Sequence, residues 1–150
     1  LSALKPGYSC VSLADDMGVP ISKVPEAVER FQAITRKYNV IVAVYGHASD
    51  GNLHTKMLLK VGDKDEWDRG IAAVDEIFKA SVELGGTVTG EHGVGISKAL
   101  NFQEERKTEL DCILAIKQAM DPKNILNPGK AAQWRGSPLR NLRYPCKEYM

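Results

Sequence analysis

The chain has 150 residues, of which 43% are hydrophobic and 26% are charged, and its formal net charge is +1. These values are typical of one globular domain with an appendage, and they give no reason to expect nucleic acid or a membrane surface as a partner. No apolar run approaches the roughly 20 residues that cross a bilayer, so no transmembrane segment is expected. Because the chain opens on Leu1 without a signal peptide, we expect it to continue a longer polypeptide.

The three cysteines, Cys10, Cys112 and Cys146, are widely spaced and form neither a disulfide framework nor a zinc-binding pattern. We therefore expect them to be packing residues of a protein in the reducing cytoplasm. Any association with a membrane would then occur through partner proteins.

Strand-forming residues alternate over positions 8–14 and predict a first strand. Ser22 is the expected N-cap of a helix that carries Pro25 in its first turn and ends at Asn39. The apolar residues of this helix fall on one face; they are Val24, Val28, Phe31 and Ile34.

The apolar run at positions 40–45 predicts a central strand, and Asp50-Gly51 predicts a hairpin turn before a return strand from residue 52 to about 60. A second amphipathic helix is expected between Gly62-Asp63 and Gly85-Gly86. Its expected buried face consists of Trp67, Ile71, Val74, Phe78 and Val82.

A short strand at 87–89 completes the order β-α-β-β-α-β. The predicted fold class is therefore α+β, with residues 1–100 forming a ferredoxin-like antiparallel sheet and two covering helices. Residues 101–130 are expected to form a C-terminal helical segment, with one helix over about 103–120 that ends before Asp121-Pro122. Its apolar set comprises Leu110, Ile113, Leu114 and either Cys112 or Ile116.

Residues 131–150 are expected to form an extended basic tail. From Lys130 onward, five basic side chains stand against one acid. Such a tail is either solvated or docked on another domain or subunit.

All three histidines, His47, His54 and His92, lie in glycine-flanked turns at strand ends. If Asp50-Gly51 forms a two-residue turn, His47 lies directly opposite His54, and the two imidazoles can hold one divalent ion. A longer loop would shift this register.

Glu91 directly precedes His92 in a segment with glycines at positions 90, 93 and 95. If this turn approaches the hairpin, Glu91 completes a ligand set of two histidines and a glutamate with an open coordination position, and His92 lies beside the metal. The alternative is that the histidines are ordinary surface or hydrogen-bonded side chains. A zinc protease and a phosphate-binding loop lack support, because the motifs HExxH, GxGxxG and GK[ST] are absent.

Three segments make the sequence recognisable: GHASDGNLH at 46–54, GEHGVG at 90–95 and DPKNILNPGK at 121–130. In order and spacing they resemble the C-terminal domain of FAD-linked oxidases, over roughly residues 8–130. This family includes the glycolate oxidase flavin subunit, D-lactate dehydrogenases and D-2-hydroxyglutarate dehydrogenase.

The resemblance implies the substrate- and metal-binding portion of an FAD-dependent 2-hydroxy-acid dehydrogenase of the glycolate or D-lactate type. It implies that His47, His54 and Glu91 bind a divalent metal, such as Zn, Mn or Fe. It further implies that His92 is the base that takes the hydroxyl proton while hydride passes to the flavin, and that Asn127 reaches the flavin-binding domain.

The implied partners are a small 2-hydroxy acid, an FAD-binding domain or subunit and an electron acceptor. Lys56 stands where D-2-hydroxyglutarate dehydrogenases have asparagine, and Ile21 stands where many members have arginine, so the identity of the substrate is open. Since the family's flavin domain precedes this segment, we expect the chain alone to bind no flavin usefully and to be inactive. The alternatives are a free-standing metal- or carboxylate-binding module that acts with a partner protein and, less favoured, a metallohydrolase.

Overall fold

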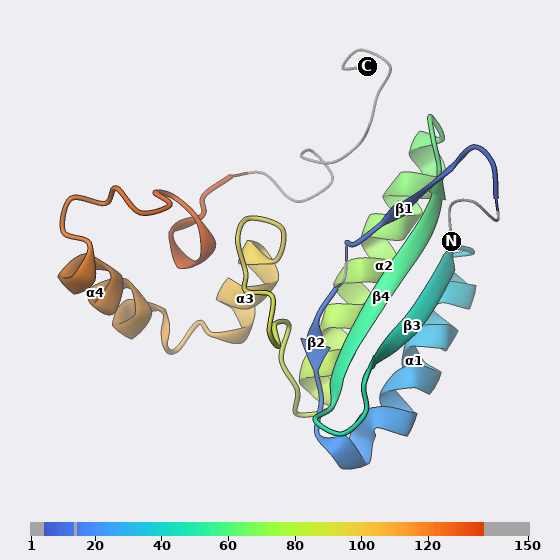
Figure 1. Cartoon of the computed structure of the whole chain (residues 1–150), viewed down its shortest axis with the longest axis horizontal. Helices are drawn as coiled ribbons and strands as arrows, with labels where there is room; N and C mark the ends of the chain where they lie inside the picture. The colour runs from blue at the N-terminus through green and yellow to red at the C-terminus, as the bar shows by residue number, and fades with distance from the viewer. Residues whose placement is uncertain (1–4, 14, 137–150) are drawn as a thin grey trace.

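The computed structural model describes residues 5–13 and 15–136, and Cys146 and most of the predicted basic tail lie outside these ranges. The chain has an α+β fold in which helices and an antiparallel sheet form two layers (Figure 1). Its elements in chain order are β1 (Tyr8–Val11), β2 (Met17–Gly18), η2 (Ile21–Lys23), α1 (Val24–Lys37), β3 (Ile41–His47), β4 (Asn52–Lys60), α2 (Lys64–Glu83), α3 (Ala99–Glu105), α4 (Leu110–Met120) and η3 (Ala131–Gln133).

The sheet is built around β4. Strand β3 pairs antiparallel with residues 52–58 along one edge of β4. Strands β1 and β2 therefore occupy the opposite edge, where β1 pairs with residues 57–60 and β2 with residues 52–53. The irregular segment between β1 and β2 consequently runs past the middle of β4, and it carries Asp15 and Asp16.

The fourth predicted strand is reduced to a single bridge, in which Thr87 pairs with Gly18. The Thr87 amide donates to the Gly18 carbonyl at 2.8 Å, and the Gly18 amide donates back at 3.0 Å. Gly86 permits this approach, because a Cβ atom at this position would lie 2.0 Å from the Gly18 carbonyl oxygen. The chain after α2 is thereby fixed against β2.

Helices α1 and α2 cover one face of the sheet, and the hydrophobic core lies between the two layers (Figure 1). Phe31 of α1 and Phe78 of α2 are fully buried there, as predicted, whereas Val82 is exposed. Successive side chains of a strand point to opposite faces, so Met57 of β4 enters the core while His54 points away from the helices. The face of the sheet away from the helices carries His47 and His54.

The start of the first helix differs from the prediction. Ser22 lies inside the 3₁₀ turn η2, in which the Lys23 amide donates to the Pro20 carbonyl at 2.7 Å. Helix α1 instead begins after Lys23, and no side chain caps it. Pro25 does lie in the first turn of α1, where a missing amide is tolerated. Helix α2 has a true cap, since the Asp63 carboxylate accepts a hydrogen bond from the Glu66 amide at 3.0 Å.

The single helix predicted over about 103–120 is also wrong, because a turn at residues 106–109 divides it into α3 and α4. None of the residues in α4 is buried, so the predicted apolar set of this helix does not enter a core. Cys112 on α4 and Cys10 on β1 are exposed, and the prediction that they are packing residues is therefore wrong. Among the described helices, none combines the length and the apolar character needed to cross a membrane.

Candidate metal centre

The hairpin between β3 and β4 places two histidines on the same sheet face. Tyr45 lies opposite His54, and His47 lies opposite Asn52, so the loop contains four residues instead of the predicted two. The direct pairing of His47 with His54 is thus wrong by two positions. A shift of two residues preserves the face, because side chains alternate with a period of two. The two imidazole rings remain neighbours, with centroids 5.4 Å apart.

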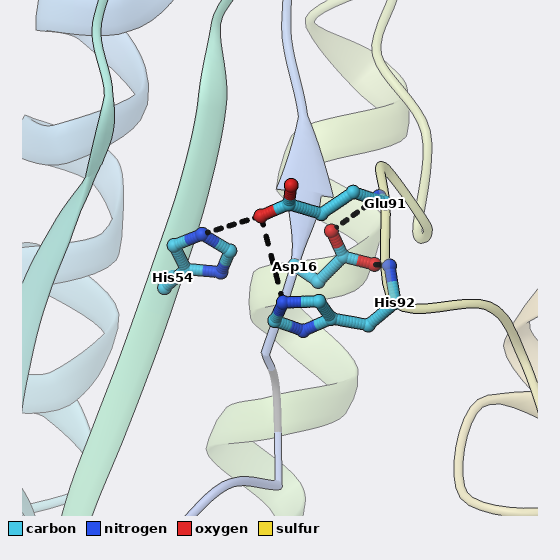
Figure 2. A group of neighbouring side chains, drawn as sticks. All are labelled: Asp16, His54, Glu91 and His92. Carbon is cyan, nitrogen blue, oxygen red and sulfur yellow. Dashed lines mark hydrogen bonds and ion pairs between the residues drawn. The ribbon is translucent and has the colours of Figure 1, made fainter.

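Glu91 meets all three histidines. Its Oε1 atom lies 3.3 Å from Nε2 of His54 and 3.5 Å from Nε2 of both His47 and His92. Figure 2 shows the Glu91 carboxylate reaching from its loop between the rings of His54 and His92. The GEHG turn (residues 90–93) therefore approaches the hairpin, which is the condition that the sequence left open.

The carboxylate of Asp16 holds the GEHG turn next to the hairpin. Its side chain is completely buried, and both carboxylate oxygens accept hydrogen bonds. The donors are the backbone amides of Gly90, Glu91 and His92 and the side chains of Asn52, Thr89 and Lys98. One carboxylate therefore holds three successive amides of the GEHG turn. Figure 2 shows the Asp16 carboxylate beside Glu91 and His92.

The electrostatics of Asp16 are consistent with a permanent anion. Burial by itself would raise the pKa of this carboxyl, but the hydrogen bonds from Lys98 and from the amides of Glu91 and His92 outweigh it and hold the pKa far below its ordinary range. The Lys98 ammonium lies 2.7 Å from Oδ2 and is itself buried. Sequence reasoning missed this residue, because its partners Gly90, Glu91, His92 and Lys98 lie 74–82 positions away and leave no local pattern around it.

His54 is the most enclosed of the three histidines, with 6% of its side chain exposed against 56% for His47 and 51% for His92. Its Nδ1 atom lies 3.0 Å from Oδ1 of Asp15. The other oxygen of Asp15 accepts a hydrogen bond from Lys56 at 3.0 Å, which raises the pKa of Lys56 even though burial opposes the shift. Lys56 also donates to the Ser12 hydroxyl.

Four side chains, Asp16, His54, Glu91 and His92, each offer a ligand atom within 4.8 Å of the others. Asp16 is unsuited to bind a metal, because its oxygens are already occupied by amide and ammonium donors. The separations of 3.3–3.5 Å between Glu91 and the imidazole nitrogens suit a shared ion. Ligands at about 2.0–2.1 Å from a tetrahedral zinc lie roughly 3.3–3.4 Å from one another. The donor set of imidazoles and one carboxylate therefore fits a divalent transition metal.

Asn127, the residue expected to reach the flavin-binding domain, lies outside this group. It occupies the exposed loop after α4 in a left-handed conformation with φ of 48°. This loop returns toward α3, where the Gln103 side chain donates to the carbonyl of Ala131 at 2.8 Å and to that of Trp134 at 3.0 Å.

Comparison with known proteins identifies the family of the chain. Residues 2–131 match the family model of FAD linked oxidases, C-terminal domain. The chain belongs to this family.

Its relatives include the glycolate oxidase subunit GlcD of Bacillus subtilis, which is 44% identical over 131 residues, covering 87% of this chain and 27% of the relative. A probable mitochondrial D-lactate dehydrogenase of Danio rerio is 33% identical over 132 residues, covering 87% of this chain and 26% of the relative. A D-2-hydroxyglutarate dehydrogenase of Stutzerimonas stutzeri is 33% identical over 121 residues, covering 77% of this chain and 26% of the relative. The family is thus one of flavin-linked oxidoreductases, and the chain spans about a quarter of the length of these relatives.

Proposed function

We propose that this chain forms the substrate- and metal-binding portion of an FAD-dependent 2-hydroxy-acid dehydrogenase that acts on a small substrate of the glycolate or D-lactate type. The observation that carries the proposal is the convergence of three imidazole nitrogens on one oxygen of Glu91 in a chain of this family. His47, His54 and Glu91 would hold the metal, which would be Zn, Mn or Fe.

His92 is the proposed base. A bound metal would act as a Lewis acid toward the 2-hydroxyl and the carboxylate of the substrate, and it would make the hydroxyl proton easier to remove. His92 would take this proton, since histidine is the most frequent general base of enzymes and half of this side chain is exposed. FAD would supply the acceptor for the hydride, and the buried His54 would keep the site in place.

The remaining part of the proposed enzyme is a flavin-binding domain or subunit that covers the region around α4. Large apolar side chains are exposed there, including Met120 at 81%, Ile125 at 71% and Leu126 at 63%. Asn127 lies next to them and would reach the flavin-binding domain. Reoxidation of the flavin would need a separate electron acceptor, and we place the assembled protein in the cytoplasm, with any membrane contact made by partners.

We also propose that the sheet is a ferredoxin-like βαββαβ arrangement within residues 1–100. Thr87 pairs with Gly18 on the side of β2 that faces away from β4. The fourth strand of such a sheet pairs with the first strand in this position.

Activity of the complete protein tests the proposal. The chain joined to its flavin-binding portion should oxidise glycolate or D-lactate with an artificial electron acceptor. His92→Gln should lower kcat by at least about a hundredfold, the range expected for loss of a general base, with metal content unchanged. An active His92→Gln enzyme would contradict the role of His92. A flavin-loaded protein that oxidises no 2-hydroxy acid would favour the alternative of a metal- or carboxylate-binding module.

A further inference from the structure

We infer that Asp15 is a positioning residue that sets the tautomer of His54, so that the Nε2 lone pair of this ring faces Glu91 and is available to a metal. The inference rests on the proposed metal centre. It assigns a role to a side chain that would not itself bind metal or substrate.

The first observation is the contact between the two side chains. Oδ1 of Asp15 lies 3.0 Å from Nδ1 of His54, and the two side chains are only 16% and 6% exposed. A carboxylate at this distance accepts a hydrogen bond and cannot donate one. The proton of a neutral His54 ring is therefore held on Nδ1, and Nε2 carries a lone pair.

The second observation is the partner of that lone pair. Nε2 of His54 lies 3.3 Å from Oε1 of Glu91, which is also an acceptor. Two acceptors at this separation repel each other unless a proton or a cation lies between them. Carboxylate, imidazole and metal arranged in this order form a recurring unit of metal sites, in which the outer carboxylate fixes the ring and increases its basicity.

The third observation is the arrangement that fixes Asp15 itself. Its Oδ2 atom accepts a hydrogen bond from Lys56 at 3.0 Å, and Lys56 also donates to Ser12. Rotation of the carboxylate away from His54 would break the contact with Lys56. Lys56 thus keeps Oδ1 directed at the imidazole ring.

This arrangement predicts an informative variant. In Asp15→Asn, Lys56 still requires an acceptor, so the amide oxygen should face Lys56 and the amide NH₂ should face Nδ1 of His54. The NH₂ group then donates to Nδ1 and drives the ring proton to Nε2, where it blocks metal binding. The shape of the side chain is almost unchanged, so a role limited to packing would not produce this effect.

The experiment is nitrogen-15 NMR of the His54 ring in the metal-free chain, with each of the two ring nitrogens assigned as protonated or unprotonated. The wild-type chain and Asp15→Glu should both show a proton on Nδ1, while Asp15→Asn should show it on Nε2. Asp68→Asn is the matched control, because Asp68 is exposed on α2 and forms an ion pair with Lys64 of the same helix. A wild-type Nδ1 without a proton, or an Asp15→Asn proton that stays on Nδ1, would overturn the inference.

Titration of the same proteins with Zn²⁺ or Mn²⁺ supplies the second readout. Loss of a carboxylate that supports a metal-bound histidine lowers affinity by about 10- to 100-fold, and we expect this loss in Asp15→Asn but not in Asp15→Glu or Asp68→Asn. Measurable binding with equal affinity in Asp15→Asn and the wild type would also overturn the inference. If the tautomers behave as predicted while no protein binds metal, the metal centre of the proposed function is contradicted and the positioning of His54 by Asp15 stands.

Discussion

Asp15 and Asp16 are adjacent in the chain, yet their carboxylates hold opposite sides of the candidate metal centre. Asp15 contacts Nδ1 of His54 at 3.0 Å, and Asp16 accepts a hydrogen bond from the Glu91 amide at 2.7 Å. Asp16 has a φ angle of 77°, an uncommon conformation for a residue other than glycine. Asp16 lies in the segment between β1 and β2, and its side chain bonds both to Asn52 of β4 and to the GEHG turn. These hydrogen bonds maintain the uncommon backbone conformation of Asp16.

Replacing Asp16 with alanine should destabilise the chain severely. The change leaves the buried Lys98 ammonium without its partner and removes the acceptor of three backbone amides. Breaking a buried pair in this way costs about 3–5 kcal/mol. The free energy of unfolding, measured by urea denaturation, should show this loss.

Lys98→Met is the comparison for that measurement. It should cost less than Asp16→Ala, because the Asp16 carboxylate keeps its backbone donors. The double variant should be less destabilised than the sum of the two single variants, since the charge left unpaired in Asp16→Ala is then gone. Additive losses would show that the contact between Asp16 and Lys98 does not stabilise the fold.

Gly51→Ala should disturb the hairpin that carries His47. Gly51 has a φ of 76°, and a Cβ atom there would lie 1.9 Å from the Val19 carbonyl oxygen. Gly62 is the matched control, because its φ is 82° but a Cβ atom would meet no atom within 4 Å. Gly62→Ala should cost about 1 kcal/mol from backbone strain alone, and Gly51→Ala should cost clearly more. Equal shifts in thermal unfolding of the two variants would contradict the close packing at Gly51.

Acid should loosen the loop after α4 through Asp121. The hydrogen bond from Lys117 lowers the pKa of Asp121, burial opposes this, and the amides of Leu126 and Ile125 lower it further. Because the folded pKa lies below the ordinary value of about 4, the stabilisation is complete above that value and is lost as the pH falls below it.

Hydrogen exchange at pH 6 and pH 3, corrected for the intrinsic rates, tests this expectation at the amides of Ile125 and Leu126. Both amides should lose protection at pH 3 in the wild type. In Asp121→Asn the difference between the two pH values should be smaller. Unchanged protection in the wild type would show that the Asp121 carboxylate does not hold the loop.

Much of the α+β fold could be predicted from the sequence, because local patterns determine it. The hydrophobic stripes placed Phe31 and Phe78 in the core, and the Asp50-Gly51 signal located the hairpin. The turn signal does not specify the number of loop residues, so the pairing of His47 was wrong by two. The shared face of His47 and His54 was nevertheless correct, because only an odd shift moves a side chain to the other face.

What could not be predicted depends on contacts between distant segments. Asp16 lies 75 positions before Glu91, and only the folded chain shows that its carboxylate holds the Glu91 amide. The exposure of Ile116 and Met120 on α4 also escaped prediction, because the periodicity of a helix indicates an apolar face without showing whether this chain covers it. Both failures concern the environment of a side chain, which its neighbours in the sequence do not specify.

The most direct test of the proposed metal centre measures the metal bound per chain after stripping and reloading with zinc, manganese or iron. The wild type should bind about one ion, the stoichiometry of a site with three protein ligands and one open position. His47→Ala, His54→Ala and Glu91→Gln should each lose it, whereas His92→Ala should retain it because His92 is the proposed base. A wild-type chain without metal would contradict the metal centre in this chain, and loss in His92→Ala with retention in His47→Ala would contradict the assigned ligands.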